Sequence, residues 1–170
     1  MDTFLAIASR RDWKRYADRP IAEDVVQRIL DAGRLAGSGG NRQPWRFFVI
    51  ESRALRDEIA ETVFAPQNVL GARLVVAVGV RGKGPTAFDG GRAVQNMLLA
   101  AWNEGIAATP NGVADPERIR SLLALAEDER PLIVLTFGHP RRPLDPESRS
   151  AEEWSAEANR KPLAEVVERR

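Results

Sequence analysis

The alternation of apolar and polar positions along the chain predicts several helices and a few strands. Apolar residues recur at helical spacing in five segments: residues 2–9, 21–35, 52–64, 91–104 and 115–126. Runs of β-branched and aromatic residues predict three strands: residues 45–50, 73–80 and 132–137. Ser52 and Asp115 stand at N-cap positions of two of these helices. Helices outnumber strands around a small sheet, which favours an α+β or three-layer architecture.

Two segments lack either pattern. Residues 107–112 are small and follow a buried helix, so we expect a loop there. Residues 141–162 are polar and contain three prolines, and only Leu163 to Val167 returns to an apolar, strand-like pattern. A hydrophilic tail is typical of disorder. Because the end of the tail is apolar, the alternative is that it adds an edge strand to another chain. We expect one domain over residues 1–170, in which, on the second alternative, residues 141–170 form a C-terminal arm on a partner subunit.

The composition narrows the possible chemistry. The 170 residues include no cysteine and one histidine, His139. Disulfides, thiolate nucleophiles, cysteine-ligated metals and two-histidine metal sites are therefore excluded, and we expect no metal. What remains is chemistry that the side chains do not perform themselves, and a cofactor is one way to supply it.

Charge and hydropathy exclude two classes of partner. The formal net charge of +1 gives no global field for nucleic acid or an anionic membrane. No apolar stretch reaches the roughly 18 residues that span a bilayer, and no targeting signal is visible. We expect a cytoplasmic protein.

Two glycine-rich or cationic segments are candidates for binding a ligand. Residues 10–15 place four cations within six residues, which suits a phosphate, although a solvated charged turn is the alternative. Residues 37–45 combine glycines, which allow close backbone approach, with the amides of Asn41 and Gln43, which can meet the edge of a heterocycle. A simple connection between helix and strand is the alternative for the second segment.

Two further segments are weaker candidates. The small residues 107–112 suit one face of a flat ring, or form an ordinary loop. Residues 159–163 form a basic patch in the polar tail, and a role as a second phosphate clamp would explain why the tail is retained.

Together and in this order, the segments resemble the FMN-dependent nitroreductase family of the short, homodimeric type. The most specific match is Ser38-Gly39-Gly40-Asn41-Arg42-Gln43-Pro44-Trp45, which is similar to the family's Ser-Ser-x-Asn-x-Gln-Pro-Trp segment. The block from Arg10 to Tyr16, the helix from Gly91 to Ala101 and the segment from Arg160 to Val167 also match family signatures. The resemblance covers nearly the whole chain, from Phe4 to Val167.

The resemblance implies a three-layer α-β-α fold with a small, mixed, mostly antiparallel sheet and a C-terminal arm exchanged with the partner. It further implies a homodimer with FMN at the subunit interface. The implied FMN contacts from one subunit are Arg10, Arg11, Asp12 and Lys14 on phosphate, ribityl chain and pyrimidine edge, Asn68 and Thr109, Pro110, Asn111 and Gly112 on the ring, and Arg160 with Lys161 on the phosphate. The partner would contribute Gly37, Ser38, Gly39 and Asn41.

The implied activity is hydride transfer from NAD(P)H through flavin N5 to a nitroaromatic, quinone or similar small acceptor, in a ping-pong sequence. No side chain acts as a catalytic nucleophile, the Asn111 backbone N–H lies near N5, and Lys14 stabilises negative charge at N1 and O2. The alternatives are other flavin chemistry on the same fold, such as that of a dehydrogenase, dehalogenase or flavin-consuming enzyme, and a non-catalytic flavin-binding dimer.

The chain departs from the family pattern at three places. Asp12 stands where the family usually has serine, and a carboxylate beside a phosphate is repulsive unless Arg10 and Arg11 neutralise it. Gly37 replaces a common proline, and the short loop 81–88 implies an open, shallow pocket.

Overall fold

The computed structural model describes residues 1–170 and divides into two compact units. The larger unit is Asp12–Leu144. The smaller unit combines Met1–Arg11 with Asp145–Arg170.

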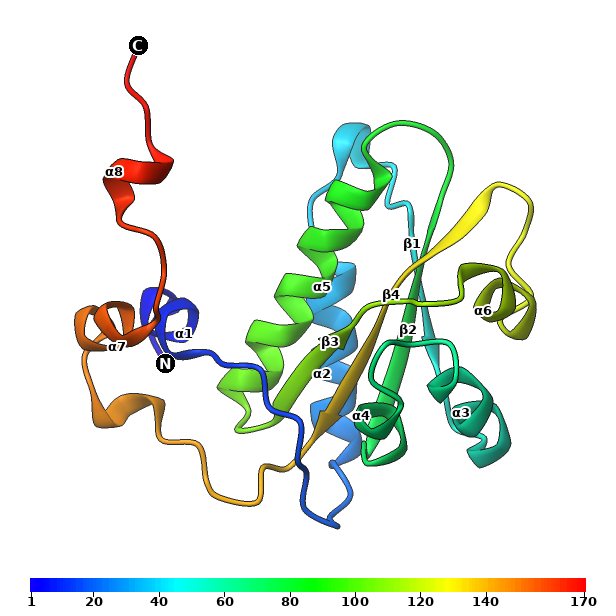
Figure 1. The fold of residues 1–170 in the computed structure, drawn as a ribbon, viewed down its shortest axis with the longest axis horizontal. Helices are drawn as coiled ribbons and strands as arrows, with labels where there is room; N and C mark the ends of the chain where they lie inside the picture. The colour runs from blue at the N-terminus through cyan, green and yellow to red at the C-terminus, as the bar shows by residue number, and fades with distance from the viewer. The chain divides into compact units, whose positions relative to one another are not determined.

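A four-stranded sheet forms the centre of the larger unit (Figure 1). The strands are β1 (Trp45–Val49), β2 (Leu74–Arg81), β3 (Ala107–Asn111) and β4 (Glu129–Gly138). Their order is β1-β2-β4-β3 and all three pairings are antiparallel, which confirms the expected α+β class and antiparallel character. The inner strand β2 is buried at every residue except Arg81, because helices cover both faces of the sheet.

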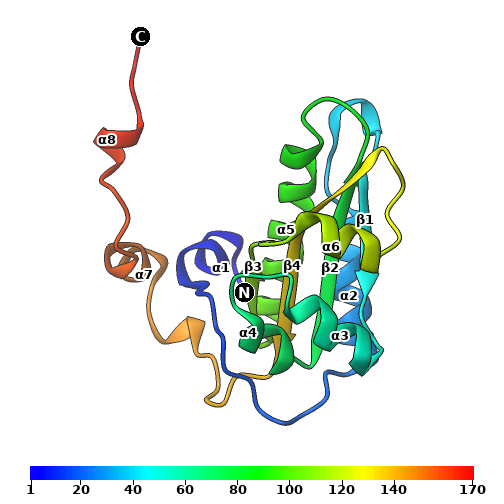
Figure 2. The ribbon, with the colours of Figure 1, turned by 45° about the vertical axis from the view of Figure 1, so that its right-hand side comes forward.

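Two helical layers enclose this sheet (Figure 2). One layer consists of α2 (Glu23–Arg34) and α5 (Thr86–Asn103), and the other of α3 (Arg53–Ala60), α4 (Pro66–Leu70) and α6 (Pro116–Leu122). The short helix η1 (Gly39–Asn41) precedes β1. The expected three-layer α-β-α arrangement is therefore confirmed.

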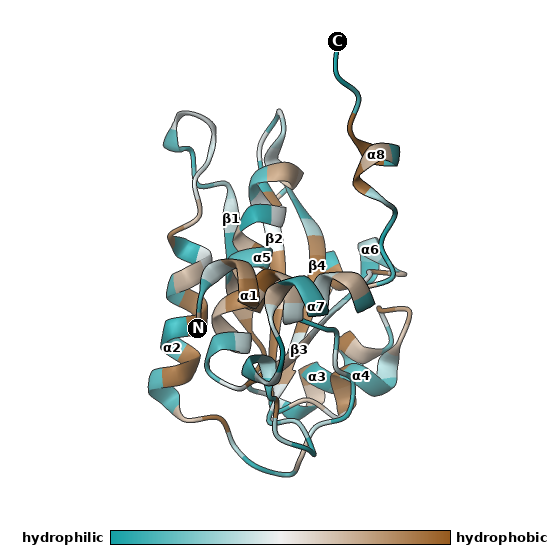
Figure 3. Cartoon of the chain, turned by 90° about the vertical axis from the view of Figure 1, so that its left-hand side faces the viewer, coloured by the Kyte–Doolittle hydropathy of each residue, from teal (hydrophilic) through white to brown (hydrophobic).

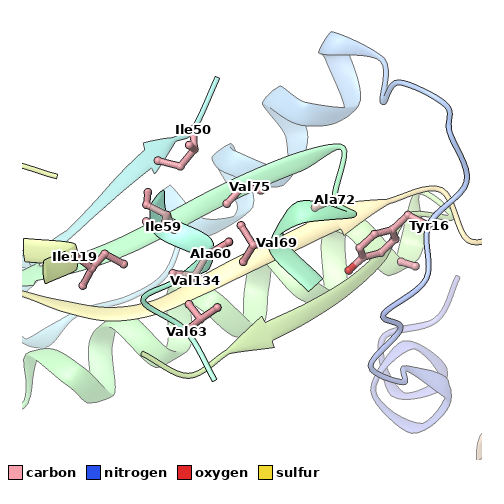
Figure 4. Packing of buried hydrophobic residues seen from close by; sticks show 12 residues of the cluster. Tyr16, Ile50, Ile59, Ala60, Val63, Val69, Ala72, Val75, Ile119 and Val134 are labelled. Atoms are coloured by element: carbon pink, nitrogen blue, oxygen red, sulfur yellow. The ribbon is translucent and has the colours of Figure 1, made fainter. Parts of the chain in front are cut away.

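Successive side chains of the inner strands pack alternately against the two helical layers. Val76 and Val78 pack with Met97 of α5 on one face, and Val75 packs with Ile59 of α3 on the other (Figure 4). The inner strands β2 and β4 carry apolar colour in the hydropathy view (Figure 3). This alternation follows from the twofold side-chain period of a strand.

The expected loop at residues 107–112 is wrong, because Ala107–Asn111 form strand β3. Its small residues and Pro110 hide the strand signal. Pro110 cannot donate to a ladder, so a strand that contains it belongs at an edge, where β3 lies.

Three helix boundaries also differ from expectation. Helix α5 begins at Thr86 rather than Gly91. Gly90 therefore lies inside the helix, where a Cβ would lie 2.7 Å from Cγ1 of Val80. Helix α3 ends at Ala60 rather than Phe64, because the next helix restarts with Pro66 in its first turn. Helix α6 ends at Leu122, two residues before Ala124 takes a φ of 48°.

The smaller unit contains α1 (Thr3–Ser9), η2 (Pro146–Ser148), α7 (Ala151–Glu157) and α8 (Leu163–Val166). Asp2 caps α1, and Ser150 with Glu153 forms a capping box on α7. The strand-like expectation for Leu163 to Val167 is wrong for this chain, since the segment forms a one-turn helix (Figure 3). Its apolar side chains Leu163, Val166 and Val167 are exposed. Exchange of the arm with a second copy stays a prediction. None of the helices combines the length and apolar character that crossing a membrane requires.

Candidate flavin site

The segment after Arg11 lies along the free edge of β3. The backbone N–H of Trp13 donates to the carbonyl of Ala108 at 3.2 Å, and the Thr109 hydroxyl donates to the carbonyl of Trp13 at 2.7 Å. Two segments about 95 residues apart, each a candidate from sequence, therefore meet in one unit.

A second backbone contact brings the end of β4 to the same place. Tyr16 forms an isolated antiparallel bridge with Pro140, and its hydroxyl lies 3.0 Å from the carbonyl oxygen of Thr136. Gly138 makes this approach possible, because a Cβ there would lie 2.6 Å from Cγ of Tyr16. The residues that follow Pro140 therefore lie near Lys14.

A cavity of about 510 Å³ opens where these segments meet. Its lining residues are Asp12, Trp13, Lys14, Arg15, Arg141 and Arg142. Four cations face one carboxylate, and the Trp13 indole adds an apolar wall. This set of donors fits a phosphate-bearing ligand with a flat apolar part.

Arg141 and Arg142 line this cavity and are not among the residues expected from the sequence. Their signal is an arginine pair between Pro140 and Pro143 in a polar tail. Long-range contacts, the bridge between Tyr16 and Pro140 and the hydrogen bond from Arg141 Nε to the Tyr16 carbonyl, bring the pair to the cavity that Lys14 also lines. Local sequence patterns carry no information about such a contact.

The two asparagines expected at the flavin ring are buried and bonded to each other. Asn68 Nδ2 donates to Asn111 Oδ1 at 2.7 Å, and Asn111 Nδ2 donates to the Thr109 carbonyl and to Thr136 Oγ1, both at 3.1 Å. This network ties α4 to β3 and β4, so it fixes the strand beside the cavity. A ring-facing role for the Asn68 amide stays a prediction.

Gly112, the residue after β3, packs closely against Phe64. The Gly112 carbonyl accepts from the backbone N–H of Phe64 at 3.1 Å. A Cβ at Gly112 would lie 3.1 Å from the Phe64 ring, so the glycine allows this close approach. Trp13, Asn68 and the segment 109–112 are therefore positioned by one connected set of contacts.

The glycine-rich loop lies elsewhere in the larger unit. The N–H of Gly39 donates to Asp89 of α5 at 3.2 Å, the space next to Gly37 is filled by Arg92, and Ser38 Oγ accepts from the Gln43 N–H at 2.8 Å. Figures 1 and 2 place this loop at the end of the unit opposite the segment 12–16. One chain does not bring Gly37, Ser38, Gly39 and Asn41 to Lys14, and their contribution from a partner subunit stays a prediction.

The remaining predicted residues belong to the smaller unit. The guanidinium of Arg11 donates to the carbonyls of Ala8 at 2.7 Å and Trp154 at 3.1 Å. Arg160 donates to the Ala158 carbonyl at 3.0 Å, and Lys161 is exposed. Phosphate binding by Arg10, Arg11, Arg160 and Lys161 stays a prediction.

Comparisons with known proteins agree with this architecture. The sequence model of the Nitroreductase family matches residues 7–84 and 81–139. A protein of Methanothermobacter thermautotrophicus, provisionally named NADH dehydrogenase/NAD(P)H nitroreductase, is 31% identical over 169 aligned residues, covering 91% of this chain and 88% of its own.

Solved structures give the same result at the level of the fold. The crystal structure of a nitroreductase family protein from Clostridium difficile superposes with a TM-score of 0.83 at 26% identity, covering 99% of this chain and 98% of its own. A protein of Desulfovibrio desulfuricans, provisionally named a nitroreductase and solved in complex with FMN, superposes with a TM-score of 0.81 at 30% identity, covering 100% and 98%. With the family model matching most of the chain, the protein belongs to the nitroreductase family.

Proposed function

We propose that this chain is an FMN-dependent oxidoreductase that uses NAD(P)H to reduce a nitroaromatic, quinone or similar small acceptor. The observation that carries the proposal is the cationic cavity where residues 12–15, the edge of β3 and Arg141–Arg142 meet. Bound FMN would supply the chemistry that the side chains lack, namely transfer of a hydride from NAD(P)H and of two electrons to the acceptor in a ping-pong sequence.

The residues of the cavity have separate tasks in this proposal. In this proposal the cations Arg15, Arg141 and Arg142 contact the FMN phosphate in addition to the expected contacts of Arg10, Arg11, Arg160 and Lys161, because a dianion is bound most strongly by several charge-assisted donors. Lys14 supplies a positive charge for the pyrimidine edge of the ring and stabilises the negative charge that reduction places there. The edge of β3 at Thr109–Gly112 flanks the ring.

The partner subunit completes the site in this proposal. A homodimer would bring the loop with Gly37, Ser38, Gly39 and Asn41 to the other copy's cavity, since one chain places the loop at the far end of the unit (Figure 1). The names of the relatives support the activity class, and the FMN complex of the Desulfovibrio desulfuricans protein supports the cofactor.

Initial-rate kinetics test the proposed activity. The purified protein, saturated with FMN, is mixed with NADH or NADPH and with a benzoquinone or a nitrobenzene at several concentrations. We expect parallel double-reciprocal lines, because the donor leaves before the acceptor binds. A flavin-loaded protein that oxidises neither nucleotide with any acceptor would leave flavin binding in place but overturn the proposed activity.

A further inference from the structure

A second cationic cavity lies beside the glycine-rich loop in the larger unit. It has a volume of about 460 Å³. Its lining residues are Arg42, Gln43, Pro44, Trp45, Arg46, Arg81, Gly82, Lys83 and Thr86. Four of these are cations and none is a carboxylate.

Two of the four cations, Arg46 and Arg81, form ion pairs with carboxylates that do not line the cavity. Arg46 Nη1 contacts both oxygens of Glu129, at 2.9 and 2.8 Å, and Arg81 lies 3.5 Å from Glu129 and 3.3 Å from Asp128. The Glu129 side chain is only 2% exposed, so its buried carboxylate holds the cavity-lining side chains of Arg46 and Arg81 in place. These contacts orient Arg46 and Arg81 and still leave roughly half of each side chain exposed.

The other two cations have no carboxylate partner in the structure. Arg42 and Lys83 are both exposed, and neither takes part in an ion pair. The four cations that line the cavity therefore meet two carboxylates, Asp128 and Glu129, which leaves a local excess of positive charge that the near-neutral chain lacks as a whole.

The cavity is continuous with a segment of the proposed flavin site. Arg42 follows directly after Asn41, the last residue of η1, which the proposed function assigns to the flavin of the partner subunit. The opposite wall is the loop 81–85, where Gly82 and Gly84 take φ values of 84° and 93° and keep side chains out of the opening.

We propose that this second cavity binds the phosphate groups of the pyridine-nucleotide donor, with Arg42 and Lys83 as its free cations. The inference rests on the proposed function, since it places the phosphate-bearing end of the donor in this cavity while the nicotinamide end reaches the flavin. Two phosphate groups of the donor have the required chemistry: the pyrophosphate of either nucleotide and the additional 2′-phosphate of NADPH. Guanidinium and ammonium groups on a cavity wall suit both.

The test compares Arg42→Ala/Lys83→Ala with Arg19→Ala/Arg53→Ala. The control removes the same number of charges from exposed positions outside both cationic cavities. Each protein is loaded with FMN, and kcat and KM are measured for NADPH and NADH with a saturating quinone. A second readout is direct binding of 2′,5′-ADP and of ADP by calorimetry, which needs no turnover.

We expect the cavity variant to raise KM for the donor about tenfold, the effect of losing one or two charge-assisted hydrogen bonds, with kcat and FMN content unchanged. A rise for NADPH alone, matched by lost affinity for 2′,5′-ADP, assigns the cavity to the 2′-phosphate. An equal rise for both donors assigns it to the pyrophosphate. Unchanged KM values and unchanged 2′,5′-ADP and ADP affinities in an active, flavin-loaded variant would overturn the inference while leaving the proposed function standing.

Discussion

At the scale of single residues, the cavity beside β3 contains opposing charges whose effects on FMN binding have opposite signs. Arg142 lines the cavity and is exposed, and Asp12 is its single carboxylate. We expect Arg142→Ala to weaken FMN binding about tenfold, because a charge-assisted contact to the phosphate is lost. Asp12→Ser should strengthen it, because a repulsion is removed.

Fluorescence titration of the flavin-free variants measures both affinities, with Arg19→Ala as the control for a change in net charge. If the two substitutions shift the FMN dissociation constant in the same direction, or leave it unchanged, the phosphate does not lie in this cavity.

The buried carboxylate of Glu129 on β4 pairs with Arg46 on β1 and Arg81 on β2, so its protonation state affects the stability of the fold in acid. Its hydrogen bond from Arg46 on β1 lowers its pKa below the ordinary value of 4.5, with a further contribution from the Ala126 N–H. The unfolded chain therefore takes up a proton at higher pH than the folded chain does. The contribution of Glu129 is complete above about pH 4.5 and is lost as the pH falls from there through the lower folded pKa.

We expect Glu129→Gln to cost about 1–3 kcal/mol of unfolding free energy at pH 7, with the difference from wild type shrinking below about pH 4.5. Urea unfolding followed by tryptophan fluorescence at several pH values measures this difference. A gap that stays constant from pH 7 to pH 3 would show that the Glu129 charge does not stabilise the fold.

Sequence patterns predict these residues unevenly. The cations of residues 10–15 are visible because they are clustered in the sequence. Arg141 and Arg142 join Lys14 through long-range contacts such as the bridge between Tyr16 and Pro140, a pairing across more than 120 residues that no local pattern encodes.

At the scale of elements, two adjacent glycines in α5 have different surroundings. A Cβ on Gly90 would lie 2.6 Å from Cδ2 of Leu132 and 2.7 Å from Cγ1 of Val80, whereas a Cβ on Gly91 would meet nothing within 4 Å. We expect Gly90→Ala to destabilise the protein by about 1–3 kcal/mol, since α5 must move off the sheet. Gly91→Ala should stabilise it by up to about 1 kcal/mol through helix propensity.

Thermal unfolding of the two variants is a matched comparison, because both add one methyl group to the same helix. Equal shifts in Tm for the two variants would mean that α5 does not pack against Leu132 and Val80 as described.

The elements themselves were mostly predictable. All seven helices and strands expected in the larger unit exist, with errors at their boundaries. Strand β3 was missed because Ala107, Ala108 and Pro110 carry little strand propensity, and its pairing with β4 is a tertiary effect. The start of α5 was missed because Gly90 weakens a helical pattern locally, although packing against β2 requires it.

At the scale of the whole molecule, the proposed dimer depends on the C-terminal arm. Leu163, Val166 and Val167 are 74%, 61% and 49% exposed, so the chain on its own leaves them in water. We expect a protein ending at Pro146 to be monomeric or aggregated, since the segment proposed to pack on the partner is gone. Size-exclusion chromatography with light scattering measures the mass, and a truncated protein that remains a flavin-bound dimer would show that the arm is dispensable.

The absorbance spectrum of the purified full-length protein shows whether the protein holds FMN and whether NADPH reduces it. We expect a yellow protein that loses its visible absorbance when NADPH is added without oxygen and recovers it when a quinone is added. A colourless protein that takes up no added FMN would overturn the proposed flavin-dependent function.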